Sequence, residues 1–129
     1  TSVLAAATNA TTGYAVAVYG TTLTSGGNTI TALATQTASS VGSSQFGINL
    51  RANTTPSVGA NVTGTGTAAA TANYATADSF RYVSGDSIAS VGAPTNGNTF
   101  TVSYMANIAG TTAPGTYTTN LTYVATGTF

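Results

Sequence analysis

Four charged side chains are the only conventional candidates for acid–base chemistry in this sequence of 129 residues. They are two arginines and two aspartates, and the chain has no histidine, cysteine, lysine or glutamate. Asp78 and Asp86 bracket the segment Phe80–Val83, so a shared carboxylate site is geometrically possible. Pairing of the two carboxylates with Arg81 and Arg51 across neighbouring strands accounts for the four charges more simply. We therefore predict ion pairs and a protein that is not an enzyme.

The missing residue types also limit which cofactors and partners the chain can bind. Catalytic triads, thiol nucleophiles, Schiff bases and zinc clusters depend on histidine, cysteine or lysine. Calcium takes about six to eight oxygen ligands, of which two aspartates would supply few. Nucleic-acid binding needs many basic side chains to neutralise phosphates, and this chain has two. We predict no cofactor, no metal and no nucleic-acid partner.

The composition favours an exported protein. Only 3% of the residues are charged, whereas soluble domains average about 25%. No apolar run approaches the ~20 residues of a membrane-spanning helix, which predicts no membrane insertion of the mature chain. The first residue is threonine, which fits removal of a leader peptide. We predict an extracellular location at the cell surface.

Four Asn-x-Thr sequons are possible sites of N-glycosylation. Chance alone produces such sequons in a threonine-rich chain. The candidate asparagines are Asn9, Asn53, Asn61 and Asn120.

Alternation of apolar and polar residues with a period of two is the main structural signal. It occurs in the segments 13–20, 45–53, 79–85, 98–109 and 115–129. The expected inward faces comprise Tyr14, Val16, Val18, Phe46, Ile48, Leu50, Phe80, Tyr82, Phe100, Val102, Tyr104, Ala106, Ile108, Tyr117, Leu121, Tyr123 and Ala125. Asn49 and Arg51 are expected on the outward face of their strand. A short helical turn is compatible with Ala68–Ala77.

Glycine-rich connections separate these segments. The sequence SGGN, residues 25–28, predicts a tight hairpin between Leu23 and Ile30. The sequence GTTAPG, residues 110–115, predicts that the last two strands are antiparallel neighbours. Together these features predict an all-β fold, an antiparallel sandwich of immunoglobulin-like or jelly-roll type, with residues 9–129 as one domain.

The sheet edges carry little protection against pairing with other chains. Natural edge strands are blunted by lysine, other charges, proline or bulges. This chain has no lysine, and its three prolines fall in predicted loops. The absence of such protection favours a subunit whose edges are covered by a neighbour.

Two stretches resemble known surface proteins. The tail APGTYTTNLTYVATGTF, residues 113–129, resembles the closing strand of secreted surface β-sandwiches, namely the WxL-type cell-wall domains, the spore-coat-U proteins and the chaperone–usher pilins. The stretch TNATTGYAVAVYG, residues 8–20, resembles an early strand of such proteins. The chain lacks the Trp-x-Leu motif of the first group and the cysteine pair common in the pilins. The resemblance implies a surface sandwich and a filament subunit completed by a neighbour's strand.

We therefore predict a structural subunit of an extracellular filament that assembles head to tail with copies of itself. Residues 1–8 are the candidate donor strand, with Val3, Ala5 and Ala7 on one face and Leu4 and Ala6 on the other. Their alternative role is that of the domain's own first strand. The residues expected along the groove and closing strand are Tyr117, Leu121, Tyr123 and a buried Phe129.

Two other functions remain open from the sequence. One is a surface-layer or adhesin module. The other is an ice-binding protein, suggested by the threonine pairs Thr22/Thr24, Thr29/Thr31, Thr99/Thr101 and Thr126/Thr128.

Overall fold

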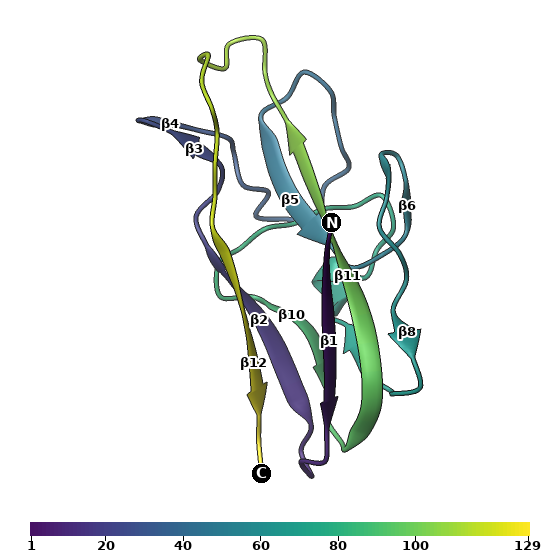
Figure 1. The fold of residues 1–129 in the computed structure, drawn as a ribbon. Helices are drawn as coiled ribbons and strands as arrows, with labels where there is room; N and C mark the ends of the chain where they lie inside the picture. The colour runs from purple at the N-terminus through teal and green to yellow at the C-terminus, as the bar shows by residue number, and fades with distance from the viewer.

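Two antiparallel β-sheets pack face to face in the computed structural model, which describes residues 1–129 (Figure 1). The first sheet has the order β1 (Ser2–Thr8), β11 (Thr95–Asn107) and β5 (Gln45–Asn49), with β8 (Thr63–Gly64) also paired to β11. The second sheet has the order β12 (Leu121–Gly127), β2 (Tyr14–Gly20), β10 (Ser87–Val91) and β9 (Ala69–Ala70). The predicted all-β sandwich is therefore confirmed.

Short elements complete the fold. The predicted hairpin at SGGN is present as β3 (Thr24–Ser25) paired with β4 (Asn28–Thr29). A second hairpin joins β6 (Asn53–Thr54) to β7 (Ser57–Val58) within a stretch where the sequence pattern predicts no separate strands. The helical turn expected within Ala68–Ala77 is the 3-10 helix η1 (Ala72–Tyr74).

The core lies between the two sheets and is built from the alternating residues. Most of the side chains predicted to face inward are buried, including Val18, Ile48, Leu50, Phe100 and Val102, each at 0% exposure. Burial of each such side chain contributes about 1.5–3 kcal/mol. The period-two pattern thus predicts most of the core correctly.

The last two long strands do not pair with each other. β11 ends at Asn107 in the first sheet and β12 begins at Leu121 in the second, so the connection that contains residues 110–115 crosses from one sheet to the other. The prediction of antiparallel neighbours was wrong, because a short loop sets the distance between two strands but not the sheet that the second one joins. β12 instead pairs with β2 along its whole length, from Leu121↔Gly20 to Gly127↔Tyr14.

Several individual side chains also differ from expectation. Phe129 is 93% exposed, because β12 ends at Gly127 opposite the first residue of β2 and no strand continues beyond that pair. Ile108 lies just past the end of β11 and is 64% exposed. Asn49, expected to face outward, is completely buried. Phe80 and Tyr82 are buried as predicted, although their segment makes isolated bridges instead of a strand.

Candidate functional site

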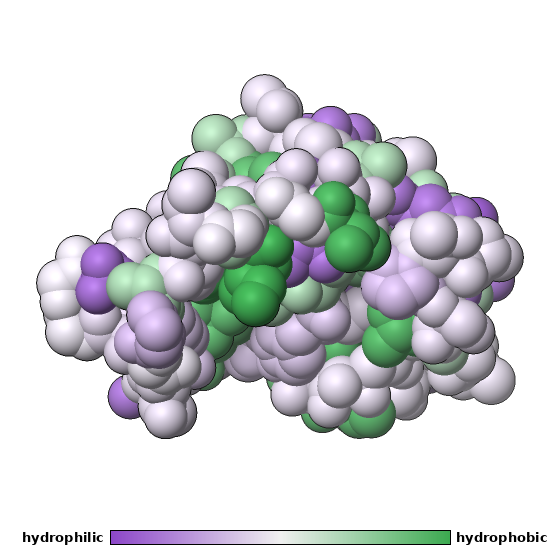
Figure 2. Space-filling model, turned by 90° about the horizontal axis from the view of Figure 1, so that it is seen from above, coloured by the Kyte–Doolittle hydropathy of each residue, from purple (hydrophilic) through white to green (hydrophobic).

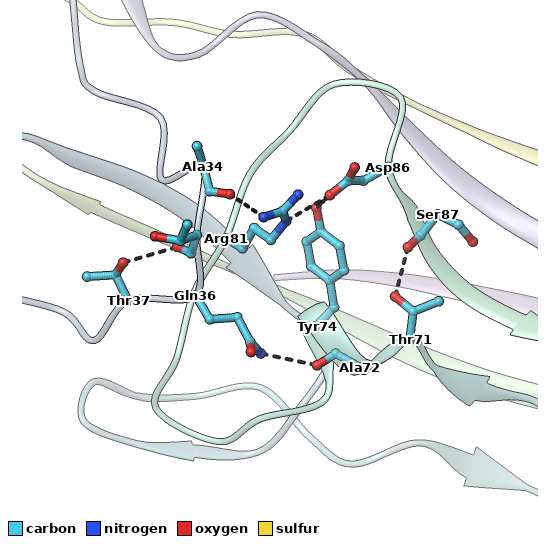
Figure 3. Close-up of polar contacts among 10 residues, drawn as sticks. Ala34, Gln36, Thr37, Thr71, Ala72, Tyr74, Arg81, Asp86 and Ser87 are labelled. Carbon is cyan, nitrogen blue, oxygen red and sulfur yellow. Dashed lines mark hydrogen bonds and ion pairs between the residues drawn. The ribbon is translucent and has the colours of Figure 1, made fainter.

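One carboxylate and one arginine pair as predicted. The Nε atom of Arg81 lies 2.8 Å from Oδ2 of Asp86, and the hydroxyl of Tyr74 donates to the same oxygen at 2.8 Å. Arg81 also donates to the carbonyl of Ala34, and Thr71 donates to the carbonyl of Ser87 (Figure 3). Tyr74 is fully buried. The cluster therefore fastens η1 and two loops to the sandwich.

The other carboxylate has a different partner from the one expected. Asp78 pairs with neither arginine; its carboxylate accepts hydrogen bonds from the backbone N–H groups of Thr54 and Thr55 and from the Thr54 hydroxyl, each at 2.7 Å. These donors, led by the Thr55 N–H, hold the pKa of Asp78 below its usual range. The prediction that both aspartates pair with arginines was therefore wrong for Asp78. Asp78 and Asp86 serve separate contacts, and the structure does not bring them into one network.

We expect an unfolding free energy that is flat between about pH 6 and 9 and falls above about pH 10. No side chain of this composition has an ordinary pKa within the flat range. Burial raises the pKa of Tyr14, Tyr74, Tyr82 and Tyr123. Above pH ~10 the unfolded chain loses phenolic protons that the folded chain retains, so rising pH favours unfolding.

At the acid end, the lowered pKa of Asp78 stabilises the fold above about pH 4, and this contribution is lost as the pH falls through the folded-state pKa. Urea unfolding monitored by circular dichroism across this pH range measures both limbs. A drop in stability between pH 6 and 9 would contradict the conclusion that only Asp78 and the buried tyrosines make the stability depend on pH.

A buried network of amide side chains, which the sequence pattern did not predict, connects the end of β5 to the β6–β7 hairpin. Asn49 and Asn53 exchange side-chain hydrogen bonds at 2.6 and 2.9 Å. Asn49 also donates to the carbonyls of Thr76 and Ser79, and Asn53 accepts from the backbone N–H of Asp78. The network joins the β6–β7 hairpin to the body of the sandwich.

This network also bears on the sequons. The side-chain nitrogen of Asn53 donates to the carbonyls of Arg51 and Val58, and the residue is 7% exposed. A glycan at that nitrogen is incompatible with this arrangement. The asparagines of the other three sequons are exposed: Asn9, Asn61 and Asn120.

Two long sheet edges are uncovered, and they lie on the same side of the molecule. β1 has β11 as its only strand partner, and β12 has β2 as its only strand partner. The far edge of β5, by contrast, is covered by bridges from Ala32 and Arg81. β1 and β12 run in the same direction in Figure 1. We call β1, β12 and the space between them the open side.

The open side contains an apolar cleft of about 280 Å³. Its eight lining residues are all apolar: Val3, Leu4, Ala5, Ala6, Val16, Phe100, Tyr123 and Ala125. No charged residue belongs to either edge strand. Among the large apolar side chains left exposed, Val3 at 66% and Val124 at 42% belong to these two strands. The open side is therefore unprotected against pairing with another chain.

The candidate donor strand β1 docks in its own sheet in this single chain. Leu4 and Ala6 pack against the core, while Val3, Ala5 and Ala7 are exposed. The buried register is thus that of Leu4 and Ala6. Of the residues expected near the groove, Tyr117, Leu121 and Tyr123 pack against the core, and Phe129 does not.

Three hydroxyl groups connect the open side from one sheet to the other. The Tyr104 hydroxyl donates to Oγ of Ser2 at 2.9 Å, and it lies 2.8 Å from the Tyr123 hydroxyl. These residues come from β11, β1 and β12, respectively. Beyond its ladder with β11, β1 is therefore held by the hydrogen bond between Tyr104 and Ser2 and by the apolar contacts of Leu4 and Ala6.

The segment between β1 and β2 is short and crosses between the sheets. It contains only residues 9–13, turns at Gly13 with φ of 76°, and buries Ala10 at 2% exposure. The hydroxyl of Thr12 donates to the carbonyl of Thr128. The backbone N–H of Thr128 in turn donates to the carbonyl of Gly13. Short connections of this kind favour exchange of the strand that they carry.

The threonine pairs of the ice-binding hypothesis do not share one surface. They lie at the β3–β4 hairpin, on β11 in the first sheet and at the end of β12 in the second sheet. Thr99 and Thr101 are also paired with β1. The regular ladder that this function requires is not formed.

The upper end of the molecule is mostly of intermediate hydropathy, with separate apolar patches between polar side chains (Figure 2).

Comparisons of this chain with protein-family models, curated proteins and solved structures found no match. None of its helical structure is long and apolar enough to cross a membrane.

Proposed function

We propose that this protein is a structural subunit of an extracellular filament and that it assembles by exchange of β1 between copies. In the monomer, β1 pairs with its own β11. In the filament, β1 of one copy occupies the same position on β11 of the next. The observation that carries the proposal is the placement of β1, an uncharged edge strand that pairs with β11 alone and is attached through a five-residue connection.

Exchange preserves the contacts seen in the single chain. The same pairs, from Ser2↔Val102 to Thr8↔Thr95, form between copies instead of within one. Head-to-tail exchange of this kind does not close on itself, so it propagates into a fibre. Because β1 makes the same ladder contacts in both states, these contacts favour neither one, and the balance between monomer and fibre depends on the connection 9–13 and on the protein concentration.

A cysteine pair tests the exchange, because the natural chain has no cysteine. Ala5 and Thr99 face each other across β1 and β11, so the double variant Ala5→Cys/Thr99→Cys places one thiol on each strand. Oxidised as a dilute monomer, this variant is expected to stay monomeric at every concentration. Oxidised after fibres have formed, it is expected to give a ladder of covalent oligomers on a non-reducing gel.

The matched control is Ala17→Cys/Val124→Cys, which joins β2 to β12 within one copy. Oxidation of its fibres is expected to give monomer alone. The proposal fails if the wild-type protein remains monomeric at high concentration, or if the locked Ala5→Cys/Thr99→Cys monomer still forms fibres.

A further inference from the structure

Tyr104 and Tyr123 face each other across the two sheets in an arrangement suited to covalent coupling. Their hydroxyl oxygens are 2.8 Å apart, and both side chains are partly buried. Tyr104 lies on β11 and Tyr123 on β12, strands that share no ladder. The two phenols are thus the polar contact between the sheets at the open side.

We propose that Tyr104 and Tyr123 form an oxidative cross-linking site that closes as a dityrosine. The chain has no cysteine for a disulfide and no lysine for an isopeptide bond. Tyrosine is then the residue type left to staple the two sheets. The proposal concerns a single folded chain and does not depend on the filament.

The oxidant is a peroxide acting through a haem peroxidase. Each phenol loses one electron and one proton to give a phenoxyl radical. The radicals join by a bond between the ring carbons next to the hydroxyls, and each of these carbons returns its hydrogen to the neighbouring oxygen. The peroxide takes up both electrons and both protons and leaves as two waters.

The surroundings favour coupling within the pair. The Tyr104 hydroxyl donates to Oγ of Ser2, so this oxygen is placed to accept the proton that the phenol loses when it is oxidised. Burial raises the pKa of the Tyr123 hydroxyl, so this phenol keeps its proton until it is oxidised. Both side chains are only partly buried, so they can lose an electron to the oxidant, but they are less exposed than Tyr19 at 47%, from which links between copies would start.

The only methionine of the chain, Met105, provides the test, because it lies between the two tyrosines. Cyanogen bromide cleaves after methionine and separates residues 1–105 from residues 106–129. The full-length protein is treated with haem peroxidase and hydrogen peroxide, and any methionine sulfoxide is reduced with a thiol before cleavage. We expect dityrosine fluorescence in the monomer band and two fragments that remain joined after cleavage.

Three variants locate the bond. Residues 106–129 contain only two tyrosines, Tyr117 and Tyr123. Tyr117→Phe is expected to stay joined, whereas Tyr104→Phe and Tyr123→Phe are expected to release both fragments. Each variant keeps its aromatic ring, and circular dichroism checks its fold. The linked wild-type protein is also expected to melt roughly 10 °C higher, because the bond closes a loop in the unfolded chain.

Separation of the wild-type fragments overturns the proposal, and so does a link that persists in Tyr104→Phe. The same treatment of protein unfolded in guanidinium serves as the reference for random coupling. A yield of joined fragments as high there as in the folded protein would also contradict a built site.

Discussion

Deletion of residues 1–8 is expected to destabilise the protein by about 3–5 kcal/mol, similar to the loss of a large core side chain, and to abolish fibre formation. The deletion removes one ladder partner of β11 and uncovers Phe100, which pairs with Leu4. It also removes the hydrogen bond between Ser2 and Tyr104. Denaturant unfolding measures the first effect, and electron microscopy with sedimentation measures the second.

The missing strand should bind and stabilise the truncated protein when it is supplied as a separate peptide. A peptide of residues 1–8 is expected to restore stability by about 2.7 kcal/mol at a hundredfold excess over its dissociation constant. A peptide carrying Leu4→Asp should fail, because its carboxylate would be buried without a partner against the core. The matched control is Ala7→Asp, at an exposed position without a ladder partner, which should still bind.

The peptide result distinguishes two roles of β1. A truncated protein that unfolds and ignores the peptide would make β1 an obligatory part of its own chain's folding unit. A truncated protein that still forms fibres would place the junction elsewhere, for example at the edge of β12. Binding of the peptide together with loss of fibres is the outcome that strand exchange requires.

The alternating pattern predicted the class of fold and most of the core because burial in a sandwich repeats every two residues. Tyr14, Val16 and Val18 are all buried, as their spacing alone predicts. The SGGN hairpin was equally predictable, since two glycines permit a tight reversal of the chain. Local rules of this kind depend on neighbours along the chain, which a sequence displays directly.

The assignment of strands to sheets was not predictable in the same way. A connection such as 110–115 has the same composition whether it joins two neighbours or crosses the sandwich, and here it crosses. The position of Phe129 depended on that assignment, because its exposure follows from where β2 begins. The open side likewise depends on the placement of both β1 and β12 at sheet edges.

Asn49 illustrates a second limit. Its place in an alternating strand predicted an outward side chain, yet it is completely buried. Its partners are Asn53 and the carbonyls of Thr76 and Ser79. A buried amide is tolerated only when its hydrogen bonds are made, and those partners come from segments whose position no local pattern reveals.

Replacement of Asn49 by aspartate is therefore expected to cost on the order of 3–5 kcal/mol at neutral pH, the usual effect of an uncompensated buried charge. The change preserves the shape of the side chain but removes the Nδ2 donor. It places a carboxylate oxygen against Oδ1 of Asn53 and two backbone carbonyls, all of which are acceptors. The β6–β7 hairpin should loosen first, since Asn53 connects it to this network.

The pH dependence of this variant identifies the cause. Burial among acceptors should raise the folded-state pKa of the new carboxyl above its unfolded value of about 3.9. Its penalty is then smallest below pH ~4, where the group is protonated in both states, and grows as the pH rises towards the folded pKa. Asn120→Asp introduces the same charge at an exposed position and should change stability by less than about 0.5 kcal/mol. Equal effects of Asn49→Asp and Asn120→Asp would mean that net charge alone, and not the buried amide network, decides the stability of the sandwich.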